Sequence, residues 1–451
     1  MRLLSLIRKY CLKLSAAVFI FTIANIGQLK CEFNKIVFFK DTLPNGLEII
    51  LHVDRSAPVV ATVLQYKVGN RDEDPNKTGY AHFFEHLMFE ATADIPRATI
   101  DKYINEAGGE LNAHTGFDET VFYFRVPSNE LKLALWIESE RMRKLKVESV
   151  GVETQRGVVM EEKKNSYDNR PYGTFLPRML EKFFNGGSYS WSAIGYEEHL
   201  KKAQISDFKE FYDNFYQPNN ATLVVAGNFD MDSCYQYIKD YFEQYPKGTE
   251  PKRQAVKINL PDKPYREEII DEKAQLPALF MAFPSPSLSD SLFYATQMLC
   301  SVLSDGESSR LYKKIINDEQ AAVEVSAQSI NLQYSGVSLI VGIPAPGVKI
   351  EKIENMISAE IDKIINEGIS DQELNKIKNI QEAKFVEGKK NVLDKAMDLA
   401  RFNCYYEKPE LINTELENIL NVTKEDIRKA AKIYLGNPNK VVLTYLPSKK
   451  Q

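Results

Sequence analysis

The segment Gly79-Tyr80-Ala81-His82-Phe83-Phe84-Glu85-His86-Leu87-Met88 places two of the chain's five histidines and a glutamate within five residues of a helix-forming stretch. Side chains at positions i and i+4 lie one turn apart on one face of a helix, so His82 and His86 can reach the same ion. Glu85 lies about 60° around the helix from His82, which places a carboxylate beside the imidazoles without making it a ligand. The pattern favours a metal site with its own base, although a His pair on an amphipathic helix can also be polar decoration near a core.

A second helical segment, residues 153–164, offers the acidic ligand that such a site requires. A catalytic zinc takes three protein ligands and keeps a fourth position open for water. The segment carries Glu161 and Glu162 directly after an apolar run. Neighbouring helical positions differ by about 100°, so only one of the two carboxylates can face the metal.

The order of these motifs resembles the pitrilysin/insulinase family of zinc peptidases, and within it the mitochondrial processing peptidase and the half-length bacterial zinc proteases. The resemblance begins with His-x-x-Glu-His and the later run Val158-Val159-Met160-Glu161-Glu162. Further matching pieces follow the family order: Leu43-Pro44-Asn45-Gly46-Leu47, Gly108-Gly109, Asn112-Ala113-x-Thr115, Glu140-Arg141-Met142, Asp168-Asn169-Arg170-Pro171-Tyr172-Gly173 and Pro218-Asn219-Asn220-Ala221. Together they cover about residues 38 to 230, with a weaker likeness to the end of the chain.

The resemblance assigns a role to each residue of the predicted metal site. It implies that His82, His86 and Glu162 bind Zn²⁺ and that Glu85 is the general base. The family register selects Glu162 over Glu161, which stays the fallback ligand. The implied activity is that of a zinc-dependent metalloendopeptidase, a hydrolase that cleaves extended peptides or small unfolded polypeptides with a metal-activated water. A processing peptidase with one defined cleavage site is the alternative enzyme, and a non-catalytic subunit that binds peptides or assembles a complex is the alternative from another class.

Strands are expected at residues 110–115 and 120–126, the first of them beside the metal helix. In the family the equivalent strand is an edge to which extended substrate pairs through its backbone. Asn112 and Ala113 carry over as substrate-binding residues, although a turn-capping amide explains Asn112 equally well. One position departs from the family pattern. Many relatives carry a glutamate seven residues before the acidic ligand, whereas this chain has Gln155, which can hydrogen-bond but cannot take up a proton. A lower rate than in those relatives is therefore expected.

An internal repeat predicts the fold. The segment from Tyr103 through Pro127 is echoed about 215 residues later by the segment from Ile315 through Pro344. We therefore predict an α+β fold of two homologous domains, each a mainly antiparallel sheet with helices packed on one face. The expected divisions are a zinc-binding catalytic domain at 33–245, a linker at 246–262 and a non-metal repeat domain at 263–451. The copy of the metal helix, at residues 294–298, has neither His nor Glu, so the second domain is expected to close over the substrate. Because a two-repeat chain resembles half of a full-length family member, we expect a homodimer or a heterodimer with a similar chain.

Composition and the N-terminal segment bound the setting. The chain has 451 residues, 44% of them hydrophobic, and a net charge of −5, which excludes disorder and does not favour nucleic-acid binding. Residues 1–27 place basic residues before a short apolar run, which is typical of a secretory signal peptide and too short for a membrane span of about 20 residues. Export, to a bacterial periplasm, is therefore predicted. The alternatives are an uncleaved anchor, which would attach the protein to a membrane, lipid attachment at Cys31, and a mitochondrial transit peptide.

Overall fold

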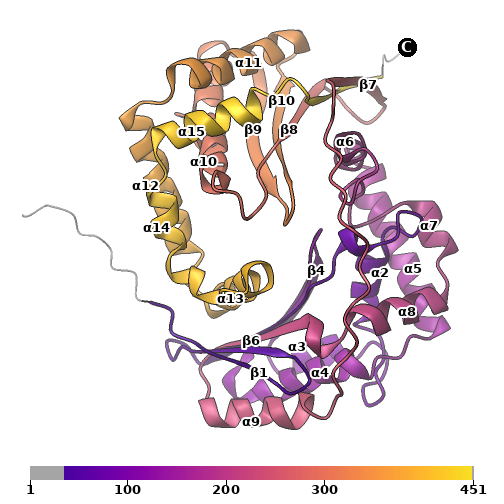
Figure 1. The fold of residues 1–451 in the computed structure, drawn as a ribbon. Coiled ribbons are helices and arrows are strands. Elements are labelled where there is room, and N and C mark those ends of the chain that lie inside the picture. Colours follow the sequence, from indigo (N-terminus) through magenta and orange to yellow (C-terminus); the bar gives the residue numbers. More distant parts are fainter. Residues whose placement is uncertain (1–34, 449–451) are drawn as a thin grey trace, which may run out of the picture. The chain divides into compact units, whose positions relative to one another are not determined.

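The computed structural model describes residues 35–448, so the predicted signal peptide and Cys31 lie outside the described residues. Within the described range the strands form two mixed sheets, one of six strands and one of five (Figure 1). In spatial order, the six-stranded sheet consists of β1 (Phe39–Thr42), β2 (Glu48–Val53), β6 (Ala221–Gly227), β3 (Val59–Tyr66), β5 (Thr120–Pro127) and β4 (Glu110–Thr115). In the same sense, the five-stranded sheet consists of β7 (Tyr265–Asp271), β11 (Val441–Pro447), β8 (Ala278–Pro284), β10 (Gly336–Pro344) and β9 (Ala322–Asn331).

The two sheets repeat one topology. β2 runs parallel to β6, just as β7 runs parallel to β11. Every other neighbouring pair is antiparallel, in the orders β6-β3-β5-β4 and β11-β8-β10-β9. β1 adds one antiparallel strand to the edge of the first sheet. The α+β fold of two copies, each with a mainly antiparallel sheet, is thereby confirmed, whereas the domain limits 33–245, 246–262 and 263–451 stay predictions.

Each half of the chain contains its own set of helices. Those of the first half are α2 (Tyr80–Leu87), α3 (Ile100–Glu106), α4 (Leu131–Arg143), α5 (Ser149–Lys163), α6 (Phe175–Phe184), α7 (Glu197–Lys202), α8 (Ile205–Phe215) and α9 (Met231–Phe242). Those of the second half are α10 (Phe293–Ser304), α11 (Ile350–Glu367), α12 (Asp371–Glu387), α13 (Val392–Tyr406), α14 (Glu415–Leu420) and α15 (Lys424–Ala430). Short 3-10 turns lie at η1 (Asn70–Asp72), η2 (Ser128–Glu130), η4 (Pro218–Asn220) and η6 (Pro409–Asn413), and π-helical turns at η3 (Lys164–Asp168), η5 (Tyr312–Asp318) and η7 (Ala431–Leu435).

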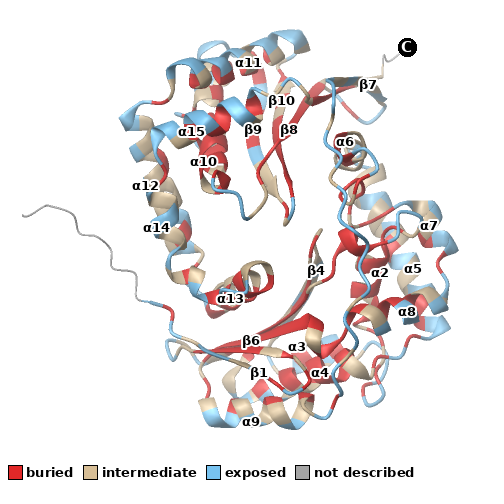
Figure 2. Cartoon of the chain, viewed as in Figure 1, coloured by how far each residue is buried: buried red, intermediate tan, exposed pale blue. Residues whose placement is uncertain are grey.

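One helix of each half packs on the sheet of the other half. α13 contacts β3 and β6 of the first sheet, where the Asn403 amide donates to Thr222 Oγ1 at 2.9 Å. In the reciprocal arrangement, α6 contacts β8 and β11 of the second sheet, and Phe183 and Phe184 belong to the same buried cluster as Phe280. β6 and β8 are consequently buried along their whole length (Figure 2). Each sheet is thus covered on its second face by a helix that is distant in sequence.

The helix that carries the histidines is shorter than the sequence suggests. The local pattern predicts an N-cap at Thr78 and a helix to about residue 91, but α2 starts at Tyr80 and ends at Leu87. Gly79 precedes it with φ 87°, a left-handed conformation that favours glycine. The buried carboxylate of Glu73 accepts hydrogen bonds from the backbone N–H of Gly79 at 2.9 Å and of Ala81 at 2.7 Å. A remote carboxylate therefore satisfies the helix N-terminus in place of the predicted cap.

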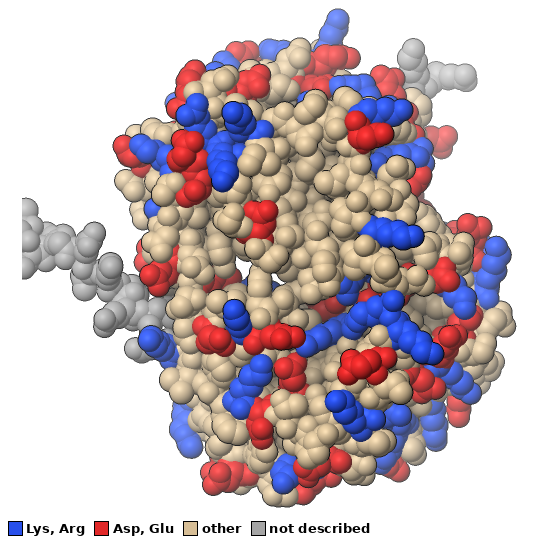
Figure 3. All heavy atoms as spheres, viewed as in Figure 1, with Lys and Arg blue, Asp and Glu red and all other residues tan. Residues whose placement is uncertain are grey.

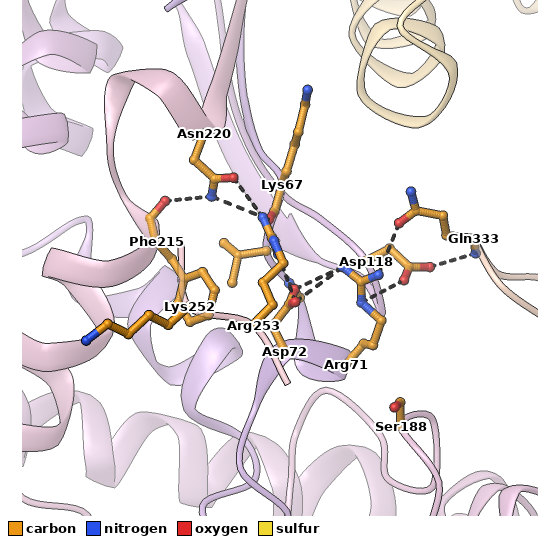
Figure 4. A network of polar contacts seen from close by, with 12 residues as sticks. Lys67, Arg71, Asp72, Asp118, Ser188, Phe215, Asn220, Lys252, Arg253 and Gln333 are labelled. Atoms are coloured by element: carbon orange, nitrogen blue, oxygen red, sulfur yellow. Dashed lines mark hydrogen bonds and ion pairs between the residues drawn. The ribbon is translucent and has the colours of Figure 1, made fainter. Parts of the chain in front are cut away.

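The segment 246–262 contains no helix or strand and is bonded closely to the first half of the chain (Figure 4). The Arg253 guanidinium donates to Asp72 Oδ1 and to Asn220 Oδ1, each at 2.8 Å, and to the carbonyl of Lys67. The backbone N–H of Lys252 donates to an asparagine on α8 at 2.8 Å. Hydrogen bonds therefore hold the predicted linker against the first half of the chain.

Arg71 connects the hairpin loops of the two sheets. Its Nε lies 3.3 Å from Asp118 Oδ1, in the loop between β4 and β5. Its Nη1 donates to Gln333 Oε1 at 3.2 Å, and the Gln333 backbone N–H donates to Asp118 Oδ2 at 2.9 Å (Figure 4). The side chains of Arg71 and Asp118 are 6% and 3% exposed, so this pair is shielded from water.

Replacing Arg71 by methionine is expected to lower the free energy of unfolding by about 3 kcal/mol, because the buried Asp118 carboxylate would lose its cation. Urea denaturation measures the change. Arg266→Met is the matched control, since the Arg266 side chain is 53% exposed in its pair with Glu354, and such pairs contribute below about 1 kcal/mol. Equal losses in the two variants would contradict the role assigned to Arg71.

Surface charge is mixed in sign. On the face drawn in Figure 3, lysine and arginine side chains are interspersed with aspartates and glutamates. Among the described residues, no helix combines the length and the apolar character needed to cross a bilayer.

Candidate active site and metal centre

Three predicted ligands from two helices meet at one point of the structure. His82 and His86 lie one turn apart on α2, with ring centroids 4.8 Å apart. Glu162, near the end of α5, places Oε2 3.6 Å from His82 Nε2 and 3.4 Å from His86 Nε2. One ligand atom from each residue lies within 4.8 Å of the others. This is the one group of at least three potential metal-ligating side chains found within residues 35–448.

The donor set fits zinc. Bonds of about 2.0–2.1 Å to a tetrahedral ion place neighbouring donor atoms about 3.3–3.4 Å apart, close to the two nitrogen–oxygen separations observed. Two imidazoles and one carboxylate also match the ligand types of catalytic zinc sites that keep a fourth position open. His82, His86 and Glu162 are therefore suited to hold such an ion together.

Glu161, the fallback ligand, faces away from the histidines. Its Oε1 accepts a hydrogen bond from the Asn165 amide at 3.1 Å, and the side chain is exposed. The rotation of about 100° between neighbouring helical residues accounts for the difference, since Glu162 then faces α2.

The electrostatics of the site favour neutral imidazole at His82. Burial, assisted by the neighbouring His86, lowers the pKa of His82 to about 4. Burial also opposes the charged form of His86, but the hydrogen bond to Glu162 and the nearby carboxylates outweigh it and raise that pKa. The hydrogen bond from His86 lowers the pKa of Glu162 against the effect of burial. An ionised carboxylate beside a neutral imidazole is the protonation state that a divalent cation requires.

Glu85 lies on the same helix and is held by the neighbouring strand. Thr115, at the end of β4, donates its hydroxyl to Glu85 Oε2 at 2.6 Å. Burial raises the pKa of Glu85, and the Thr115 hydrogen bond partly offsets that effect. Thr115 leaves the second carboxylate oxygen, Oε1, available for another partner.

A cavity of about 610 Å³ contains all the predicted site residues. Its lining includes His82, Glu85, His86, Asn112, Ala113 and Glu162. β4, which carries Asn112 and Ala113, is the terminal strand of its sheet within the described residues, as predicted. The Asn112 side chain is exposed, and its Oδ1 accepts from the backbone N–H of Ala113 at 2.9 Å.

Three contributors to the site were not recognised in the sequence. Thr115 holds Glu85, as described above. Tyr167, in η3, lines the cavity, and burial raises the pKa of its hydroxyl. Glu90 accepts a hydrogen bond from Gln155 Nε2 at 2.8 Å, behind His86. Local periodicity carried no signal for these contacts, because each one joins elements distant in sequence.

The remaining histidines take no part in the ligand set. His52 is buried in β2, with Nδ1 2.7 Å from the carbonyl of Val37. His199, on α7, places Nδ1 2.9 Å from the hydroxyl oxygen of Thr78. His114 lines the cavity from β4 but lies outside the ligand group. In the second half, α10 packs on β9 as α2 packs on β4, and α10 carries no His or Glu.

Comparison with protein families matches most of the chain to two models of one family. Residues 48–195 match the model described as "Insulinase (Peptidase family M16)" and residues 202–381 match the model described as "Peptidase M16 inactive domain". The candidate ligands all fall in the first of these regions, which agrees with their absence from α10.

Known proteases resemble the chain along most of its length. The zinc protease PqqE of Helicobacter pylori is 27% identical over 395 residues, which are 85% of each chain. The crystal structure of a protease from Helicobacter pylori matches with a TM-score of 0.86 and 25% identity, covering 91% of this chain and 100% of that one.

Two further structures match in fold. The periplasmic protease PqqL of Escherichia coli matches with a TM-score of 0.75 and 20% identity, covering 91% of this chain but 47% of PqqL. A chain of complex III from Candida albicans matches with a TM-score of 0.75 and 15% identity, covering 90% of this chain and 95% of that one, so the same fold occurs within a multisubunit complex. On the matches along both halves, the chain belongs to the M16 (insulinase) family of peptidases.

Proposed function

We propose that this chain is a zinc-dependent endopeptidase that hydrolyses extended peptides or small unfolded polypeptides. The observation that supports this best is the convergence of His82, His86 and Glu162 on one point, with Glu85 in the same cavity. The similarity to a zinc protease supports the same reaction class.

The reaction assigns a separate task to each part of the site. A zinc ion held by the three ligands supplies Lewis-acid activation of water and of a peptide carbonyl. Glu85 takes the proton of the attacking water at Oε1, the oxygen that Thr115 leaves free, and passes it to the leaving amine. Asn112 and Ala113 bind the substrate backbone along the edge of β4, so recognition depends little on side-chain sequence.

The test uses the chain from residue 28 onward, which omits the predicted signal. Bound metal is measured, and an unstructured quenched peptide is assayed with and without a chelator. Stoichiometric zinc with chelator-sensitive cleavage is the expected result. Zinc without cleavage, also after addition of co-purifying chains, would favour the non-catalytic peptide-binding or assembly role.

Thr115→Val is expected to lower kcat/KM by about tenfold, the lower end of the effect of removing an outer hydrogen-bond partner. The valine has the same shape but cannot donate to Glu85, so the carboxylate loses its fixed orientation. Thr115→Ser retains the hydroxyl and should restore most of the rate. Zinc content is measured in both variants, and a valine variant with parental kcat/KM at full zinc would contradict this role.

We further propose that the protein is exported to the periplasm and acts as a dimer, with the second half of a chain closing over the substrate. PqqL, which is about twice as long as the region matched here, is named as a periplasmic protease, and two copies of this chain would approximate its length. Sedimentation of the purified chain tests the pairing, and a monomer at assay concentrations contradicts it.

A further inference from the structure

Behind His86, three side chains form a chain of hydrogen bonds that ends at the surface. Gln155, on α5, donates from Nε2 to Glu90 Oε1 at 2.8 Å. Arg97 donates to the same carboxylate from Nε and, at 3.3 Å, from Nη2. Gln155 also lines the cavity beside His86, and after Glu162 and Glu85 it contributes a side-chain hydrogen bond that favours the protonated imidazole. The order is therefore Arg97, Glu90, Gln155 and His86.

The site around Glu90 is built to hold a buried carboxylate. The Glu90 side chain is 6% exposed, whereas that of Arg97 is 39% exposed. Gly151 lies one turn before Gln155 on α5, and a Cβ at that position would lie 3.3–3.4 Å from the side-chain atoms of Glu90. A glycine at position 151 therefore lets the carboxylate approach the helix closely.

The donor and acceptor roles in this series of hydrogen bonds fix the orientation of the Gln155 amide. An ionised carboxylate only accepts hydrogen bonds, so Gln155 must turn its NH₂ group towards Glu90. The amide oxygen is then the group that faces His86, and it can accept only from a protonated ring nitrogen. A metal-binding imidazole needs one nitrogen deprotonated towards the ion and the other held by an acceptor.

We propose that Glu90, through Gln155, is a positioning residue that orients His86 for zinc binding. The inference rests on the proposed zinc site and specifies how this chain supports it. The carboxylate, at position 90, acts on His86 only through the neutral amide at position 155. It fixes the orientation of that amide, which in turn holds the His86 ring. Arg97 supplies the balancing charge.

The proposal predicts that the two side chains can be exchanged but not changed singly. In Gln155→Glu, two carboxylates face each other and neither can donate to the other, so their repulsion moves the acceptor at position 155 out of its fixed place beside His86. In the exchanged variant Glu90→Gln/Gln155→Glu, Arg97 donates to the amide oxygen introduced at position 90, the NH₂ group of that amide donates to the carboxylate introduced at position 155, and this carboxylate accepts from His86. The exchanged pair has the same charge and almost the same atoms as the parent.

The experiment measures zinc affinity of the metal-free full chain in competition with a chromophoric chelator. Gln155→Glu is expected to bind zinc about 10- to 100-fold more weakly, the usual effect of losing an outer hydrogen-bond partner of a metal ligand. The exchanged variant should return to within about threefold of the affinity of the parent, because the two changes compensate each other. Glu153→Gln, an exposed glutamate on the same helix, is the matched control and should leave the affinity unchanged. Gln155→Ala, which removes the bridge without adding a charge, should also weaken binding. Thermal unfolding of each metal-free variant separates loss of affinity from loss of fold.

Each outcome decides the matter. Parental affinity in both Gln155→Glu and Gln155→Ala overturns the positioning role while the proposed zinc site stands. An equal loss of zinc affinity in the single and exchanged variants also overturns it, because the direction of the hydrogen bonds would then have no effect. Restored affinity in a protein that does not cleave peptides supports the positioning role and counts against the proposed peptidase. A parent that binds no zinc overturns both.

Discussion

Replacing Glu85 by glutamine is expected to lower kcat by about 10²- to 10⁴-fold, the range attributed to a positioned acid or base. Glutamine preserves the shape of the side chain and can still accept the Thr115 hydroxyl, so the cavity should keep its geometry. It cannot take a proton from water, and the proposed reaction would lose its base. The measurement combines the quenched-peptide assay with the zinc content of the purified variant, which should remain stoichiometric.

Glu110→Gln provides the matched control for this result. Glu110 lies on β4, the strand whose later residues line the same cavity, but it is not one of the lining residues, and its side chain is 51% exposed in its pair with Arg125. The control should keep the parental kcat. A Glu85→Gln variant that retains zinc and cleaves at the parental rate would contradict the assignment of Glu85 as the base.

Glu162→Gln is expected to weaken zinc binding by more than about 100-fold, beyond the effect of outer partners, because the proposed anionic ligand itself is lost. The two imidazoles would remain, but the variant would lack the anionic donor that lies 3.4–3.6 Å from both of them. Loss of activity should parallel loss of metal. The readout is zinc affinity by chelator competition, with cleavage measured over the same range of zinc concentrations.

The neighbouring glutamate makes the control unusually close. Glu161→Gln changes the same group one residue earlier on the same helix, and its side chain bonds to Asn165 on the solvent side. The control should bind zinc as the parent does. If the Glu161 variant lost zinc and the Glu162 variant kept it, the register taken from the family resemblance would be wrong.

The sequence was most informative where function depends on helical spacing. His82, His86 and Glu85 could be placed from their spacing on a helix alone, and the structure brings all three to one cavity. The choice of Glu162 over Glu161 came from the family register, and the geometry agrees with it. Strand β4 was also located at its observed bounds, because alternation over six residues is a local property.

The contacts that refine the site could not be predicted in this way. Gly79 is the N-cap of α2, and the remote carboxylate of Glu73 accepts hydrogen bonds from the N–H groups at this end of the helix, so the local signal at Thr78 was misleading. Thr115 and Glu90 act through neighbours on other elements, and no periodicity within one segment records such pairings. The exchange of α6 and α13 between the two sheets has the same origin, since an amphipathic helix does not specify which apolar face it will cover.

Anomalous diffraction at the zinc edge from crystals of the zinc-loaded protein tests the central claim most directly. The account predicts one strong peak bonded at about 2.0–2.2 Å to a ring nitrogen of His82, a ring nitrogen of His86 and a carboxylate oxygen of Glu162, with Glu85 near the ion but not bound to it. A peak held by other residues, or no peak between these side chains in a zinc-loaded protein, would contradict it.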